Sequence, residues 1–111
     1  MEIFSWLIVG HLVGDFLLQN NWMAVNKTRN SLPLVVHSLV YTSAVGLFAL
    51  LGGGLSLTAL AIIFIFHVLL DNRVFVGLWV KHINGAEDIP WLRIVVDQSW
   101  HILILALVTL L

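Results

Sequence analysis

The chain has 111 residues, of which 60% are hydrophobic and only 10% are charged. A soluble domain carries about a quarter charged residues, and a short chain needs them most because its surface is large relative to its core. This composition excludes a freely exposed soluble monomer and intrinsic disorder. The net charge of −1 argues against nucleic acid as a partner, and the lack of cysteine excludes disulfides and thiolate metal sites. What remains is a small integral membrane protein.

Four apolar runs follow one another along the chain, each near the roughly 20 residues that a membrane-spanning helix requires. We expect an all-α fold, an integral membrane four-helix bundle in which residues 1–111 form a single transmembrane domain. The second run begins at Pro33, which suits a first helical turn, and Gly52-Gly53-Gly54 separates it from the third. The expected spans cover residues 3–20, 33–51, 55–72 and 91–111.

The basic residues predict the orientation of these spans. With four spans, the first and third connections lie on the same side of the membrane. All five basic side chains fall in or beside those two connections: Lys27, Arg29, Arg73, Lys81 and Arg93. The positive-inside rule therefore places both connections in the cytoplasm and both termini outside.

The connection at residues 73–89 is the longest of the three. Its apolar residues recur at helical spacing on the face opposite Arg73 and Lys81. It therefore forms either a short interfacial helix between the third and fourth spans or an extension of the third span. Residues 84–90 are typical of a turn that leads into the fourth helix, and His82 is expected at the surface.

Each expected span carries one polar pair at a spacing of four residues, which places both side chains on one helix face. At a rise of about 1.5 Å per residue, three pairs lie roughly 6 to 15 Å inside the cytoplasmic ends of their spans, and the pair of the third span lies level or slightly shallower. We therefore expect the four pairs to converge in the inner leaflet. They are His11 with Asp15, His37 with Tyr41, His67 with Asp71, and Asp97 with His101.

The cost of ionisable groups in a bilayer constrains how these pairs are arranged. Each costs roughly 2.5 to 3.5 kcal/mol on insertion scales, so the side chains must face one another or a cavity. They form either a closed hydrogen-bonded network or a site for a divalent metal. Without cysteine, the donors suit zinc first, with manganese and iron as alternatives. The candidate ligands are His11, Asp15, His37, His67, Asp71, Asp97 and His101.

The remaining polar residues have candidate roles around such a site. One carboxylate is expected to act as a general base and Tyr41 as a hydrogen-bond donor or acid rather than a ligand. Lys27 either neutralises a substrate phosphate or lies among lipid headgroups, and Ser38 needs no role beyond bonding its own helix backbone. The candidate catalytic residues are Asp15, Asp97 and Tyr41. The candidate substrate-binding residues are Gln19, Lys27 and Gln98.

These motifs resemble a known family. At His11-x-x-x-Asp15-Phe16-x-x-Gln19, Lys27, His37-x-x-x-Tyr41, His67-x-x-x-Asp71 and Asp97-Gln98-x-x-His101, the chain is similar to a bacterial and phage family of small membrane proteins, domain of unknown function thirty-three-oh-seven. The resemblance covers nearly the whole chain. It implies a multi-pass protein of the bacterial inner membrane and no established activity. In architecture and His/Asp usage alone, the chain is also similar to inner-membrane metal-dependent hydrolases.

Three functions fit these features. The first is a metal-dependent hydrolase of a lipid or lipid-linked substrate at the inner leaflet, with membrane lipids as its partners. The second is a metal-ion or proton transporter or channel subunit, as a homo-oligomer, although the outer halves of the spans offer no polar path. The third is a structural or partner-binding membrane subunit, for which Gly10 and Gly14 allow close helix packing.

Overall fold

A computed structural model describes residues 2–111, and within that range the secondary structure is entirely helical. Three helices continue directly into short turns of different pitch: the π turns η1 (Val13–Leu17) and η3 (Val80–Asn84) and the 3-10 turn η2 (Leu50–Gly52). The α-helices are α1 (Ile3–Leu12), α2 (Asn21–Asn26), α3 (Ser31–Ala49), α4 (Leu57–Asp71), α5 (Val74–Trp79) and α6 (Pro90–Val108). The predicted all-α class is confirmed.

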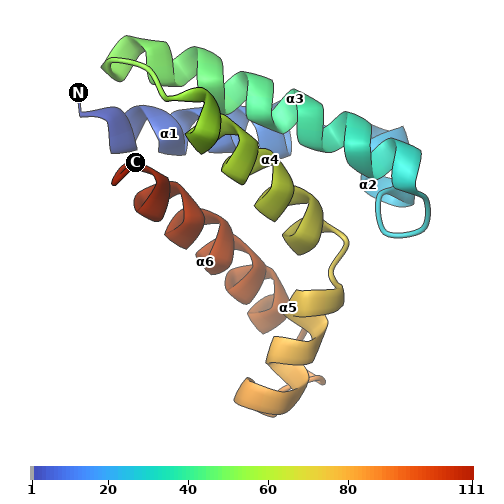
Figure 1. Ribbon diagram of the computed structural model, residues 1–111. Helices are drawn as coiled ribbons and strands as arrows, with labels where there is room; N and C mark the ends of the chain where they lie inside the picture. The colour runs from blue at the N-terminus through green and yellow to red at the C-terminus, as the bar shows by residue number, and fades with distance from the viewer. Residues whose placement is uncertain (1) are drawn as a thin grey trace.

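Four helices pack in a closed ring, in which α1 contacts α3, α3 contacts α4, α4 contacts α6, and α6 contacts α1. Both chain termini and the α3–α4 turn lie at one end of this ring, while α2 and α5 lie toward the other (Figure 1). We call these the apolar end and the polar end, because the buried His and Asp side chains lie toward the second.

Two helices are long and apolar enough to cross a membrane: residues 31–52, formed by α3 with η2, and α6. Helix α4 becomes a third candidate span when it is counted together with α5 and η3, from which it is bent by 59°. Helix α1 with η1 has 15 residues, and their length of about 22 Å falls short of a bilayer core of about 30 Å. Two spans are therefore supported, and four remain a prediction.

The third connection is a separate helical segment and not a straight extension of α4. Arg73 breaks the chain between α4 and α5 with a φ of 67°, a left-handed conformation that non-glycine residues rarely adopt. Residues 74–84 then continue as α5 and η3. A straight extension of the third span is therefore wrong, whereas a span bent by 59° at this break and an interfacial placement of α5 both remain predictions.

Two boundaries differ from the expected ones. Helix α3 begins at Ser31, two residues before Pro33, so the proline lies within the first turn, where its missing N–H has no helical partner to lose. The first connection contains a helix that was not expected, α2, whose start is capped because the Asn20 side chain accepts a hydrogen bond from the Met23 N–H at 2.9 Å. The fourth helix, α6, begins at Pro90, one residue before the predicted start of the fourth span at residue 91.

Glycines set the distance between α1 and α3. A Cβ atom on Gly10 would lie 2.8 Å from the Val45 Cα, and one on Gly14 would lie 2.9 Å from the Tyr41 Cα. Such distances leave no room for a methyl group, so these two backbones touch because both residues lack a side chain. The predicted close packing through these glycines is confirmed.

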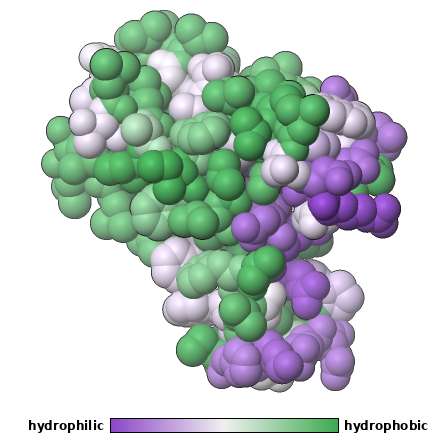
Figure 2. Space-filling view, turned by 45° about the vertical axis from the view of Figure 1, so that its right-hand side comes forward, coloured by the Kyte–Doolittle hydropathy of each residue, from purple (hydrophilic) through white to green (hydrophobic). Residues whose placement is uncertain are grey.

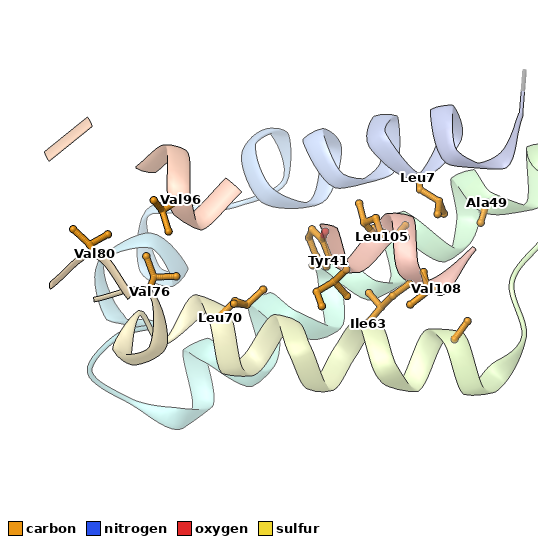
Figure 3. Packing of buried hydrophobic residues seen from close by; sticks show 13 residues of the cluster. Leu7, Tyr41, Ala49, Ile63, Leu70, Val76, Val80, Val96, Leu105 and Val108 are labelled. Atoms are coloured by element: carbon orange, nitrogen blue, oxygen red, sulfur yellow. The ribbon is translucent and has the colours of Figure 1, made fainter. Parts of the chain in front are cut away.

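The exterior of the molecule, and not its core, differs from that of a soluble protein. Figure 3 shows one cluster of buried apolar side chains, which extends from Leu7, Ile63 and Leu105 to Val76 and Val80. Outside, large apolar side chains are widely exposed. In Figure 2 they cover most of the visible upper body, while hydrophilic side chains gather toward the right and on the lower lobe that α5 and η3 form. Lipid is the solvent that fits this exterior.

Candidate metal centre

The four ring helices bring all four polar pairs into one interior region. Seven of the eight side chains are at most 4% exposed, and the eighth, Asp97, is 14% exposed. Asp15 lies in the π turn η1, where the Leu18 N–H donates to the Val13 carbonyl oxygen at 2.8 Å. Single π turns within helices frequently occur at functional sites. The predicted convergence of the pairs is confirmed.

The first group of possible metal ligands combines two imidazoles and two carboxylates. The His37 Nε2 atom lies 3.0 Å from the Asp15 Oδ1 atom and 2.9 Å from the Asp71 Oδ2 atom. The His67 Nε2 atom lies 3.2 Å from the same Asp15 oxygen. One donor atom from each of the four residues lies within 4.8 Å of all the others, so this group could hold a metal ion.

The second group consists of Asp71, Asp97 and His101, and it shares Asp71 with the first. The His101 Nδ1–H donates to the Asp97 backbone carbonyl at 2.7 Å, so a neutral His101 presents the lone pair of its Nε2 atom. That nitrogen is buried, lies 3.5 Å from the Asp71 Oδ1 atom, and has no hydrogen-bond partner within residues 2–111. The Asp97 Oδ1 atom is likewise unpartnered there.

His11 belongs to neither group, although it was a predicted ligand. Its Nε2–H donates to the Gln98 Oε1 atom at 2.7 Å, and its Nδ1 atom accepts from the Tyr41 hydroxyl at 2.8 Å. Both ring nitrogens are therefore occupied. The structure brings together six of the seven predicted ligands and places His11 beside them, with its Nδ1 atom 3.9 Å from the Asp15 Oδ2 atom.

Tyr41 and Ser38 position the His67 imidazole from α3. The Tyr41 ring stacks on that imidazole with a centroid separation of 3.9 Å. The Ser38 hydroxyl is fully buried and lies 3.0 Å from the His67 Nδ1 atom, which leaves the Nε2 atom directed at Asp15. The interpretation that Ser38 serves only its own helix backbone was wrong. Its spacing of three residues from Tyr41 is the signal that could have placed it on the same face.

Lys27 lies inside the cluster and not among lipid headgroups. Its Nζ atom is 2.7 Å from the Asp71 Oδ2 atom and donates to the Gln19 Oε1 atom at 2.7 Å, and the residue is only 6% exposed. The unexpected helix α2 and the turn that follows it bring this lysine back toward α4. No periodicity in residues 20–30 predicts that return, so the position of the ammonium group could not be inferred from the sequence.

The cluster opens to the surface through a cavity of about 480 Å³ at the polar end. With neutral imidazoles, its three carboxylates and the ammonium of Lys27 leave two negative charges, which one divalent cation would balance. The three predicted substrate-binding residues all border the cavity, whereas Tyr41 does not. The polar lining consists of Asp15, Gln19, Lys27, Asp71, Arg73, Glu87, Arg93, Asp97 and Gln98.

Comparison with known proteins places the chain in a family. The family model described as Protein of unknown function (DUF3307) matches residues 3–111. The chain belongs to this family. No curated protein and no solved structure matches it. Membership of the DUF3307 family therefore confirms the resemblance seen in the motifs, while the chemistry of the protein rests on the geometry of its cluster.

Proposed function

We propose that this DUF3307 protein is an integral membrane protein that binds a divalent metal in its His/Asp cluster and hydrolyses a lipid or lipid-linked substrate at the inner leaflet. One observation carries the metal: Asp15, His37, His67 and Asp71 are all buried, and one donor atom from each lies within 4.8 Å of all the others. The Asp15 Oδ2 atom is also buried without a hydrogen-bond partner within residues 2–111, and a metal would use it.

The donor set fits such an ion. Asp15, His37, His67 and Asp71 would hold it, since two imidazoles and two carboxylates suit zinc, manganese or iron. Metal-binding imidazoles usually have their second ring nitrogen fixed by another group. Here the Ser38 hydroxyl does so for His67, whereas the buried Nδ1 atom of His37 has no hydrogen-bond partner within residues 2–111.

The cavity gives the cluster access to water and substrate. A divalent metal lowers the pKa of a bound water to about 7 and so supplies hydroxide near neutral pH. We assign Asp97 as the general base, because its carboxylate borders the cavity and one of its oxygens is unpartnered within residues 2–111. This carboxylate would take the proton of the attacking water as the water oxygen bonds to the carbonyl or phosphoryl centre. The bond to the leaving oxygen then breaks, and the protonated Asp97 returns the proton to that oxygen, so that the alcohol leaves. Tyr41 acts as a positioning residue through His11.

The apolar end supports an enzyme over a channel. There the interior of the ring is filled by Leu7, Val45, Ile63 and Leu105, each at most 1% exposed. A conducting path needs polar groups or water along its length. The residues that line the cavity come from the polar end.

The test is metal removal and reloading of the purified protein in detergent. We expect a chelator to lower the thermal unfolding temperature, and zinc, manganese or iron to restore it and to support hydrolysis of p-nitrophenyl esters of a fatty acid or of phosphate. Asp15→Asn should abolish both responses, whereas Asp88→Asn, an exposed carboxylate outside the cavity, should leave them unchanged. Protein that retains no metal and unfolds identically with and without chelator would overturn the proposal.

A further inference from the structure

The cavity has a buried floor and a charged, exposed rim. Its floor contains the carboxylates of Asp15 and Asp71, whereas Arg73, Arg93 and Glu87 line it from exposed positions. Arg73 lies at the break between α4 and α5, and Arg93 lies in the first turn of α6. Two segments that are 20 residues apart in the sequence thus place guanidinium groups around one opening.

These two arginines are available to a ligand. No carboxylate within residues 2–111 forms an ion pair with either of them, whereas the third cation of the cavity, Lys27, is engaged by Asp71. A guanidinium group presents a planar fork of N–H donors that matches the oxygens of a phosphate group. Basic pockets between helices at the cytoplasmic face of a membrane commonly bind the anionic headgroups of lipids.

The charge of the cavity depends on the metal. Its four carboxylates outnumber its three cations, so the lining alone carries one net negative charge. One divalent cation at the cluster makes the sum positive. Recognition of an anion at the rim therefore rests on the proposed function, because the metal-loaded cavity attracts an anion that the metal-free cavity repels.

An apolar groove continues from this cavity along the exterior of α6. It has a volume of about 610 Å³ and shares Ile94 and Gln98 with the cavity. The twelve-residue step from Ile94 to Ala106 corresponds to about 18 Å along the helix. In a bilayer this face meets hydrocarbon. The groove is lined by Ile94, Val95, Gln98, Ser99, Ile102, Leu103 and Ala106.

We propose that the substrate is a phosphate-bearing amphiphile whose phosphate is bound by Arg73 and Arg93 above the metal cluster and whose hydrocarbon chain lies in the α6 groove. The shared polar residue Gln98 marks the point where head and chain meet. Free phosphate could make the same contacts with the two arginines, but it has no hydrocarbon to place in the groove. Binding of the hydrocarbon chain therefore distinguishes a lipid from free phosphate.

Calorimetric titration of the metal-loaded protein in a neutral detergent tests this assignment with four probes. They are dioctanoyl phosphatidic acid, the shorter dibutyryl phosphatidic acid, dioctanoylglycerol and inorganic phosphate. We expect the dioctanoyl phosphatidic acid to bind about tenfold or more tightly than each of the others, because only it fills both parts of the site. If inorganic phosphate binds as tightly, the proposed binding of a hydrocarbon chain in the groove is wrong. If dioctanoylglycerol binds as tightly, the proposed binding of phosphate by the arginines is wrong.

Substitutions of the two arginines at the rim provide the second part of this test. Arg73→Asn with Arg93→Gln should weaken binding of dioctanoyl phosphatidic acid about tenfold or more; asparagine is chosen because it tolerates the left-handed backbone at this position. Arg29→Gln and Lys81→Gln, exposed cations outside the cavity, serve as matched controls and should change it less than twofold. Arg93→Gln alone, in a regular helix, keeps the test valid if the double variant does not fold.

The metal content of the same samples separates this inference from the proposed function. Metal retained by every variant, with binding equal in the rim variants and their controls, would overturn the role of the arginines and leave the metal centre standing. Wild-type protein without metal would overturn the proposed function itself. The expected result is metal retained in all variants and binding weakened only by the rim substitutions.

Discussion

The apolar and polar ends of the ring are built from the same four helices but are held together differently. At the apolar end, Gly10 brings the backbone of α1 against that of α3, and buried aliphatic side chains fill the interior. At the polar end, the interior contains His37, His67 and Asp71, all at most 2% exposed, and it opens into a cavity. The comparison indicates that the two ends have different roles. Close packing at the apolar end fixes the positions of the helices, and this holds the ionisable groups of the polar end in an interior where unpaired groups would be unfavourable.

This division has an energetic reason. In lipid, apolar side chains gain nothing by leaving the solvent, so small residues and van der Waals contact must hold the helices together. Buried ionisable groups are unfavourable unless they are paired, and the attraction between them depends on accurate geometry. The rigid apolar end can supply that geometry. The following experiments test whether the two ends differ as described.

The largest expected difference is in access from the two sides of the membrane. The chain lacks cysteine, so single variants can be labelled selectively. A membrane-impermeant thiol reagent added outside intact cells should label Thr58→Cys, near the apolar end, and should not label Thr28→Cys until the membrane is opened. Both threonines are exposed. Labelling of Thr28→Cys in intact cells would contradict the orientation predicted from the basic residues.

The next effect concerns the buried ammonium group of the polar end. Lys27→Met should destabilise the protein by about 3–5 kcal/mol, because it removes the cation that pairs with the buried Asp71 carboxylate. Lys81→Met, at an exposed position, should change the stability by less than about 0.5 kcal/mol. Unfolding in detergent, followed by circular dichroism, measures both. Equal stability of the two variants would show that the Lys27 ion pair contributes nothing.

A smaller effect is expected at the apolar end. Gly10→Ala places a methyl group 2.8 Å from the Val45 Cα and should cost about 1–3 kcal/mol through forced separation of the two helices. Gly77→Ala is the matched control, because nothing lies within 4 Å of its added Cβ and it should be neutral or stabilising. The same unfolding measurement applies. Tolerance of the Gly10 substitution would refute the idea that backbone contact sets this end.

Much of the candidate site could be predicted from the sequence, because it depends on helical periodicity. The spacing of four within each pair and the antiparallel order of the apolar runs were sufficient to place six ligand candidates together. The same reasoning placed the glycine contacts of α1. These features depend only on regular helices, in which the spacing of residues along the sequence determines which side chains share a face.

The features that could not be predicted depend on irregular backbone. The π turn at Asp15, the left-handed Arg73 and the short helix α2 have no periodic signal. They decide that α5 bends away from α4 and that Lys27 returns to Asp71. Likewise, the separation of His11 from the ligand groups depends on its hydrogen bonds to Tyr41 and Gln98, which no spacing specifies.

The metal content of the purified protein, measured by elemental analysis in three forms, tests the central claim most directly. The wild type should contain bound divalent metal, and Asp71→Asn should lose it, because Asp71 belongs to both ligand groups. His11→Gln should retain metal, because both of its ring nitrogens are already occupied within the protein. A wild type without metal, or an Asp71→Asn variant with undiminished metal, would contradict the account.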